Sequence, residues 1–170
     1  MRGIRGVGLL ALVFAACEDP RSEARAEGLV VEDVAAYWAV RGQDAEKNHY
    51  IHPVIRFQIR NQGSEEVGYV QAMAVFKRET FPDEPWGNAF IYSISETPIP
   101  PGGTSDVLTL RCDTNFVSKD TPEQMFDNEK WERVWVEVFL RAGPSSWKPA
   151  LTEDIPKRIG APGLDKFISH

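Results

Sequence analysis

The stretch IHPVIRFQIRNQGS, residues 51–64, carries the clearest secondary-structure signal in the chain. Its apolar residues Ile55, Phe57 and Ile59 alternate with arginine and glutamine. This period of two places the apolar side chains on one face of a β-strand and the polar side chains on the other. The residues at 61–64, Asn-Gln-Gly-Ser, favour a turn. The stretch therefore predicts an antiparallel strand with one buried face, followed by a turn.

Similar short patterns recur on both sides of this strand, separated by turns such as TPIPPGGTS at 97–105. We expect further strands over residues 29–41, 67–79, 89–95, 105–112, 131–142 and 147–155. The last of these should lie at a sheet edge, because Pro149 cannot donate a backbone hydrogen bond. Thr-Pro-Glu-Gln at 121–124 predicts the start of a helix of about two turns. The expected fold class is mainly β: an antiparallel β-sandwich of six to seven strands with one short helix near 122–129.

Composition and charge limit the classes of partner. The chain has 170 residues, 42% of them hydrophobic, which suffices for one domain with a real core. The formal net charge is −6, and loss of residues 1–16 would make it −8 because Arg2 and Arg5 would go. Phosphate contacts dominate nucleic-acid affinity, so an acidic domain without a basic stripe is not expected to bind nucleic acid.

The N-terminus, MRGIRGVGLLALVFAAC, has the layout of a secretory signal peptide over residues 1–16. Two arginines come first, an apolar run follows from Gly6 to Ala16, and small residues precede Cys17. As a helix this run would be only about 16 Å long, too short for a permanent membrane span. One interpretation of Cys17 is an incidental residue behind an ordinary signal peptide.

Phe14-Ala15-Ala16-Cys17 resembles the lipobox of bacterial lipoprotein precursors. The resemblance implies that a diacylglycerol thioether forms on Cys17 and that the signal is then cut before it. Two or three acyl chains would anchor the protein stably to a membrane. The implied location is the bacterial cell envelope, on the periplasmic side of the outer membrane or at the surface. Residues 17–28 would be a lipidated, charged tether, 29–159 the sandwich domain and 160–170 a flexible tail.

From about residue 52 to 112 the layout resembles small immunoglobulin-like domains of bacterial envelope lipoproteins, such as the FxLYD type. The resemblance rests on IRFQIRNQGSEEV (55–67), YVQAMAVF (69–76) and PIPPGGTSDVLTL (98–110). It implies an immunoglobulin-like arrangement of the sandwich. The Leu-Tyr-Asp element of that family is absent, since Lys77, Arg78 and Glu79 follow Phe76.

The sequence gives no sign of catalysis, a metal or a cofactor. It contains none of the Gly-x-Ser-x-Gly, Walker, Rossmann or His-Glu-x-x-His motifs, so we expect no enzyme. His49 and His52 stand three residues apart, which on a strand directs their rings to opposite faces and disfavours a shared metal. Cys112 alternates with Leu108 and Leu110, and should be a buried thiol.

Aromatic residues are the candidate binding groups. In 131–142 the valines predict the buried face, which places Trp131, Trp135 and Phe139 on the opposite face. That face is either covered, by the helix near 122–129 and the C-terminal segment, or it is a recognition surface. Trp86 stands in a loop and Trp147 follows a turn, where binding residues also occur. The predicted function is a non-catalytic module that binds another envelope protein; the alternative is glycan or peptidoglycan binding through Trp86, Trp135 and Trp147.

Overall fold

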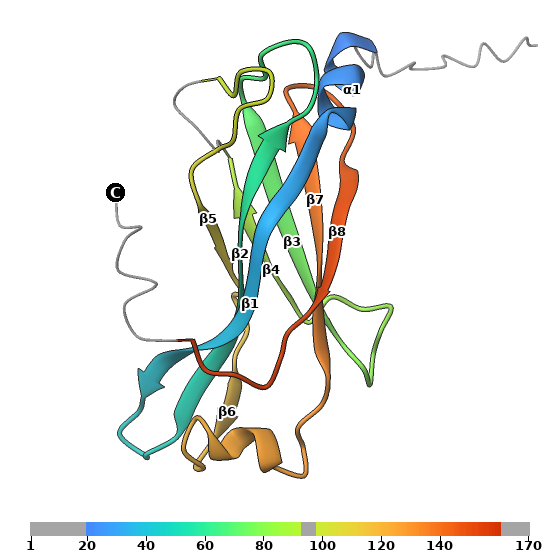
Figure 1. Cartoon of the computed structure of the whole chain (residues 1–170). Helices are drawn as coiled ribbons and strands as arrows, with labels where there is room; N and C mark the ends of the chain where they lie inside the picture. Colours follow the sequence, from blue (N-terminus) through green and yellow to red (C-terminus); the bar gives the residue numbers. More distant parts are fainter. Residues whose placement is uncertain (1–19, 93–97, 161–170) are drawn as a thin grey trace, which may run out of the picture.

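Two four-stranded antiparallel sheets face each other in the computed structural model, which describes residues 20–92 and 98–160 (Figure 1). The first sheet comprises β1 (Leu29–Gln43), β2 (His49–Asn61), β5 (Leu108–Arg111) and β6 (Phe116–Ser118), with β6 paired to β2. The second has the order β4 (Gly87–Ile91), β3 (Val70–Arg78), β7 (Val134–Ala142), β8 (Lys148–Asp154). The orders β1-β2-β5 and β4-β3-β7-β8 correspond to A-B-E and C′-C-F-G of immunoglobulin-like sandwiches. The predicted fold class is confirmed, with β6 as a short strand that the sequence did not indicate.

The core lies between the sheets and follows the alternation seen in the sequence. Ile55, Phe57 and Ile59 of β2 are completely buried, and so are Val136 and Val138 of β7. Complete burial of such side chains contributes roughly 1.5–3 kcal/mol each to folding. The inward faces of both central strands were therefore predicted correctly.

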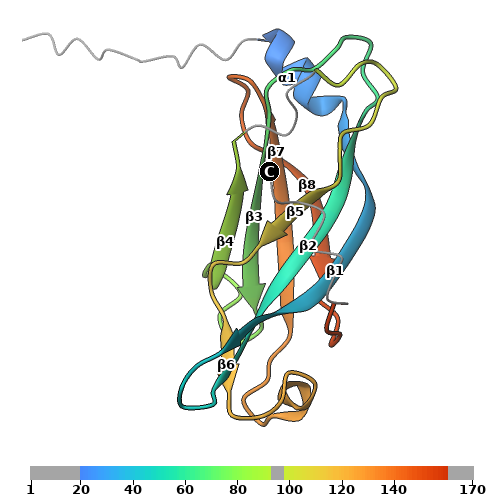
Figure 2. The same ribbon diagram turned by 90° about the vertical axis from the view of Figure 1, so that its left-hand side faces the viewer.

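The β1–β2 hairpin extends past the end of the second sheet (Figure 2). The pairing of β1 with β2 shifts register between Glu32 and Ala35, where Asp33 has a φ of 52°. After this irregularity the side chains of Ala36 and Trp38 point into the core. Val40, which shares their side of the strand, is 49% exposed. The hairpin has left the sandwich at that point, and no second sheet lies opposite.

The helix expected near 122–129 is shorter than predicted. It is a single 3₁₀ turn, η1 (Gln124–Asp127), which contributes the buried side chains Met125 and Phe126. The Thr121 backbone N–H and hydroxyl both lie within hydrogen-bond distance of Gln124 Oε1, at 3.3 and 3.1 Å. The predicted helix start at 121–124 is therefore correct, but the helix ends after one turn. This single turn places the two apolar residues against the core.

The charged tether expected over 17–28 is a helix in the part that the structure describes, and not a free linker. Pro20–Glu27 form the helix α1, which packs against one end of the sandwich (Figure 1). Ser22 and Ala26, one helical turn apart, are buried. A helix of eight residues is unstable alone, so its contacts with the sandwich must stabilise it. Those contacts involve residues far away in sequence, and composition could not reveal them.

Several predictions concern residues outside the described ranges. Cys17, the signal peptide over 1–16 and all of the predicted tail except Gly160 are among them. Gly160 donates its backbone N–H to Trp38 O at 2.8 Å. Among residues 20–92 and 98–160, no helix has the length and apolarity that a membrane crossing requires.

Candidate binding surface on the second sheet

An apolar row crosses the outer face of the second sheet, at right angles to its strands. Phe90 of β4, Met73 of β3, Phe139 of β7 and Pro149 of β8 are consecutive partners in the register. Pro149 is exposed, and the other three side chains are half-buried. We call these four residues the apolar row. Every strand of the sheet contributes one member, because outward positions on neighbouring strands lie side by side.

Trp147, which directly precedes β8, reaches across the outer face to Phe90 of β4. Its ring centroid is 5.6 Å from that of Phe90, and Arg141 Cζ lies 4.8 Å from the Trp147 centroid. Arg141 also donates hydrogen bonds to Gln71 Oε1, one of them from Nε at 2.7 Å. Tyr92 contacts Phe90 edge to face at 4.4 Å and is 73% exposed. Aromatic rings and an arginine are thus gathered beside the row.

The other side of the row carries paired charges. Lys77 and Glu137 form an ion pair at 3.1 Å between β3 and β7. Further along, the Arg133 guanidinium contacts Asp154 at 2.7 Å and lies 5.9 Å from the centroid of Trp135. Apolar and aromatic side chains with a charged margin are the usual composition of a protein-binding surface.

A second aromatic cluster closes the core at the end that carries η1. Trp38, which is 1% exposed, lies 4.6 Å from Trp131 and 6.1 Å from Trp86 between ring centroids. Phe116 and Phe126 pack on Trp131 at 5.1 and 4.8 Å. A pocket of about 320 Å³ borders this cluster. Because its rings contact one another and the core, we assign a structural role to this cluster and not a binding role.

The structure separates the predicted binding residues into two groups. Trp135, Phe139 and Trp147 lie on the outer face of the second sheet, whereas Trp86 packs on Trp38 at the end of the core. Trp131, expected on the outer face, also belongs to that end cluster. It precedes the first residue of β7, so the alternation of the strand does not apply to it.

Cover of this face by the helix near 122–129, which was part of one of the two alternatives, is wrong. Met125 and Phe126 of η1 belong to the core cluster between the sheets, and η1 lies beyond the end of β7 (Figure 2). The C-terminal segment was expected to contribute to that cover: its described part, up to Gly160, packs on the first sheet, and residues 161–170 lie outside the described ranges. Sequence reasoning also missed Met73, Phe90 and Tyr92 as outward residues. The alternation of β3 places Met73 opposite to the buried Ala72 and Ala74, and this signal was available.

The outer face of the first sheet is polar. Arg56, Gln58 and Arg60 of β2 lie on it, and Arg60 approaches Glu32 at 3.6 Å. Its apolar residues Tyr37, Ala39 and Val54 form a separate buried cluster. The chain after β8 returns to this face, where Trp38 donates its backbone N–H to Arg158 O at 2.8 Å. A Cβ on Gly160 would overlap the Tyr37 ring, so the two residues are in close contact.

The remaining candidate groups have structural partners. Burial raises the pKa of the Cys112 thiol to about 12, which makes it a poor nucleophile. His49 Nδ1 lies 2.8 Å from the backbone oxygen of Asp120, while His52 is buried. Within the described part of the chain, no three His, Cys, Asp or Glu side chains are grouped as metal ligands would be.

Comparison with known proteins adds only distant structural likeness. No protein-family model and no curated protein matches the chain. The X-ray structure of Northeast Structural Genomics Consortium target SoR45 is similar at 15% identity and a TM-score of 0.43, covering 86% of this chain and 97% of that one. The crystal structure of a protein from Archaeoglobus fulgidus is similar at 13% identity and a TM-score of 0.40, covering 73% and 93%.

Proposed function

We propose that this chain is a lipid-anchored protein of the bacterial cell envelope that binds another envelope protein without catalysis. The observation that carries the proposal is the apolar row, Phe90, Met73, Phe139 and Pro149, on the outer face of the second sheet. The Trp147 ring lies on this face, 5.6 Å from the Phe90 ring between centroids. Apolar side chains that lie next to one another on the outer face of a sheet, beside exposed aromatic rings, are a common feature of binding surfaces.

The shape of this surface favours a protein partner over a glycan. Sugar binding through Trp86, Trp135 and Trp147 would need their rings to line one groove. Trp86 instead packs in the end cluster. Trp135 stands four residues before Phe139 on β7, which at ~3.3 Å per residue separates the two by about 13 Å along the strand. A sheet face with one apolar row and a paired-charge margin suits the flat, amphipathic surface of another protein.

The anchor follows from the resemblance of residues 14–17 to a lipobox. Mass spectrometry of the mature protein tests it directly. We expect the N-terminal peptide to begin at Cys17 and to carry a diacylglycerol thioether, and we expect Cys17→Ser to release the protein from membranes. A mature N-terminus without lipid on Cys17 would overturn the anchoring part of the proposal.

Affinity isolation of the lipidated protein from its own membranes tests the binding part. We expect recovery of one protein at a stoichiometric level, and we expect Phe139→Lys to abolish it. Gln58→Lys, on the outer face of the first sheet, is the matched control and should retain the partner. Recovery that Phe139→Lys does not reduce would contradict the assignment of the surface.

A further inference from the structure

Helix α1 begins very close to the proposed lipid. Only Glu18 and Asp19 separate Cys17 from Pro20, the first residue of the helix. Consecutive Cα atoms are ~3.8 Å apart, so the chain can place Cys17 at most about 11 Å from Pro20. The end of the sandwich that α1 contacts must therefore stay near the acyl chains.

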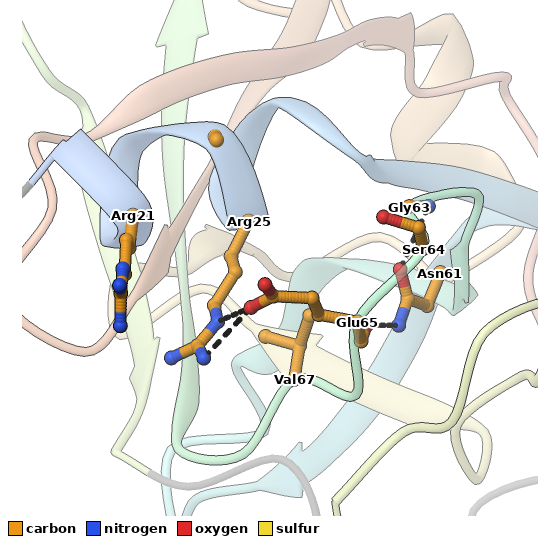
Figure 3. A pocket seen from close by; sticks show the side chains of 8 residues that line it. Arg21, Arg25, Asn61, Gly63, Ser64, Glu65 and Val67 are labelled. Atoms are coloured by element: carbon orange, nitrogen blue, oxygen red, sulfur yellow. Dashed lines mark hydrogen bonds and ion pairs between the residues drawn. The ribbon is translucent and has the colours of Figure 1, made fainter.

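Contacts with two loops attach α1 to the sandwich. Glu23 accepts a hydrogen bond from the Ser146 backbone N–H at 2.6 Å and forms an ion pair with Lys148 at 2.6 Å. These partners lower the pKa of Glu23, with the bond from Lys148 as the largest cause. On the other side, Arg25 contacts Glu65 through both Nε and Nη2, at 3.0 and 2.9 Å (Figure 3).

The loop that Arg25 contacts is itself well ordered. The Asn61 side-chain amide donates to the backbone oxygen of Glu65, and its Oδ1 accepts from Gly63 N–H at 2.9 Å (Figure 3). The same amide also donates to the backbone oxygen of Ile99 at 2.9 Å. Asn61 is completely buried. The helix therefore rests on a loop tied into the sandwich, and movement of α1 as a free tether would break these contacts.

The two ends of the sandwich differ in charge. The segments at the α1 end, 20–28, 62–69, 98–104 and 143–148, carry four acidic and three basic side chains. The segments at the opposite end, 41–50, 79–86, 112–132 and 155–160, carry eleven acidic and six basic side chains. Glu18 and Asp19, which precede α1, add two negative charges to the first end. An anionic lipid surface therefore repels both ends over a Debye length of about 8–10 Å, and repels the first somewhat less.

Exposed tyrosines lie toward the α1 end. Tyr69, immediately before β3, is 58% exposed, and its backbone oxygen accepts a bond from Gly143 in the β7–β8 turn. Tyr92, immediately after β4, is also on this side, because Ile91 pairs with Ala72 near the start of β3. Tyrosine is a preferred residue at the boundary between lipid headgroups and water.

We propose that the α1 end of the sandwich lies directly against the lipid headgroups, with the β1–β2 hairpin and η1 directed away from the membrane. This inference rests on the proposed lipidation of Cys17. The α1 end would thus contact a lipid surface and not another protein. The apolar row then lies on a face roughly perpendicular to the membrane, where a protein anchored in the same membrane can reach it.

Energy transfer from fluorophores at the two ends tests this orientation. Ser64→Cys marks the α1 end and Glu46→Cys marks the hairpin tip; both positions are exposed. The buried Cys112 thiol, with a pKa of about 12, should not compete for the label. Each labelled, lipidated full-length protein is reconstituted into phosphatidylcholine–phosphatidylglycerol vesicles that contain acceptor-labelled headgroups.

We expect several-fold higher transfer from Ser64→Cys, because a hairpin strand of 13 residues separates the sites by about 40 Å. A Gly-Ser linker inserted between Asp19 and Pro20 should reduce this difference while the protein still floats with vesicles. Equal transfer from both sites in floating protein would overturn the orientation and leave the anchor standing. Failure to float, with no lipid on Cys17, would overturn the anchor and the orientation together.

Discussion

Both sheets carry apolar side chains on their outer faces, but these side chains are covered in different ways. The first sheet has an apolar patch of Tyr37, Ala39 and Val54, and the chain itself returns after β8 to bury it, with Gly160 against Tyr37. The second sheet has the apolar row, where Trp147 and Tyr92 contact Phe90. Among the described residues the two outer faces therefore differ in how their apolar side chains are covered, and the proposed binding role of the apolar row rests on that difference.

The largest effect should separate buried from outward phenylalanines. We expect Phe57→Ala to lower the free energy of unfolding by about 3–5 kcal/mol, because Phe57 is completely buried and its removal leaves a cavity. Phe139→Ala should cost less, about 1–2 kcal/mol, since its side chain is only partly buried on the outer face and its removal leaves no closed cavity. Urea denaturation measures both. Equal losses would mean that the apolar row is part of the interior.

The next effect concerns binding. Placing a charge within the apolar row by Phe139→Lys should weaken the complex with the partner by about 2 kcal/mol or more, roughly 30-fold in Kd. Gln58→Lys should change Kd less than twofold, because it lies on the polar face of the first sheet. Titration with the isolated partner measures both variants, with thermal denaturation as the control for folding. If both variants lost affinity to a similar extent, the partner would not distinguish the outer face of the second sheet from that of the first.

A third effect tests how the first sheet is covered. We expect Gly160→Ala to destabilise the fold by about 1–2 kcal/mol, because the new Cβ overlaps the Tyr37 ring and displaces the returning chain. Hydrogen exchange at the Trp38 amide, which donates to Arg158 O, should accelerate. Gly68→Ala is the matched control, since its Cβ would make an ordinary contact with Pro98 at 3.7 Å. Unchanged exchange at Trp38 would show that residues 158–160 do not seal this face.

The smallest effect is electrostatic and belongs to the hairpin of the first sheet. Hydrogen bonds from Asn48, and then from Tyr50, lower the pKa of Asp44 to about 2. The folded state therefore gains stability from ionised Asp44 above the ordinary carboxyl pKa of ~3.9, and loses it as pH falls toward about 2. We expect Asp44→Asn to flatten the pH dependence of stability between those values. An NMR titration that finds an ordinary pKa for Asp44 would contradict this.

Local alternation allowed much of the fold to be predicted. Ile55 and Val136 face the core because their strands are regular, and the sandwich follows from several such strands with turns between them. The Thr-Pro-Glu-Gln signal at 121–124 likewise marked the start of η1, whose Met125 and Phe126 are buried. In each case the signal lies within a few consecutive residues.

Contacts between distant segments were not predictable in the same way. Helix α1 forms because Glu23 and Arg25 find partners at Lys148 and Glu65, and none of this is visible in the charged sequence of 20–27. Trp147 reaches Phe90 across two intervening strands, which no local pattern indicates. The candidate surface was therefore foreseen as outward aromatics of β7, but its continuation over β3 and β4 required the structure.

Site-specific photo-cross-linking in intact membranes tests the central claim most directly. A photoreactive amino acid replaces Val75, which neighbours the apolar row on β3, or Gln58, on the outer face of the first sheet. We predict that the probe at Val75 gives one strong cross-link to a membrane-bound protein and that the probe at Gln58 gives none. A cross-link to that protein from Gln58 but not from Val75 would contradict the assignment of the second sheet as the binding surface.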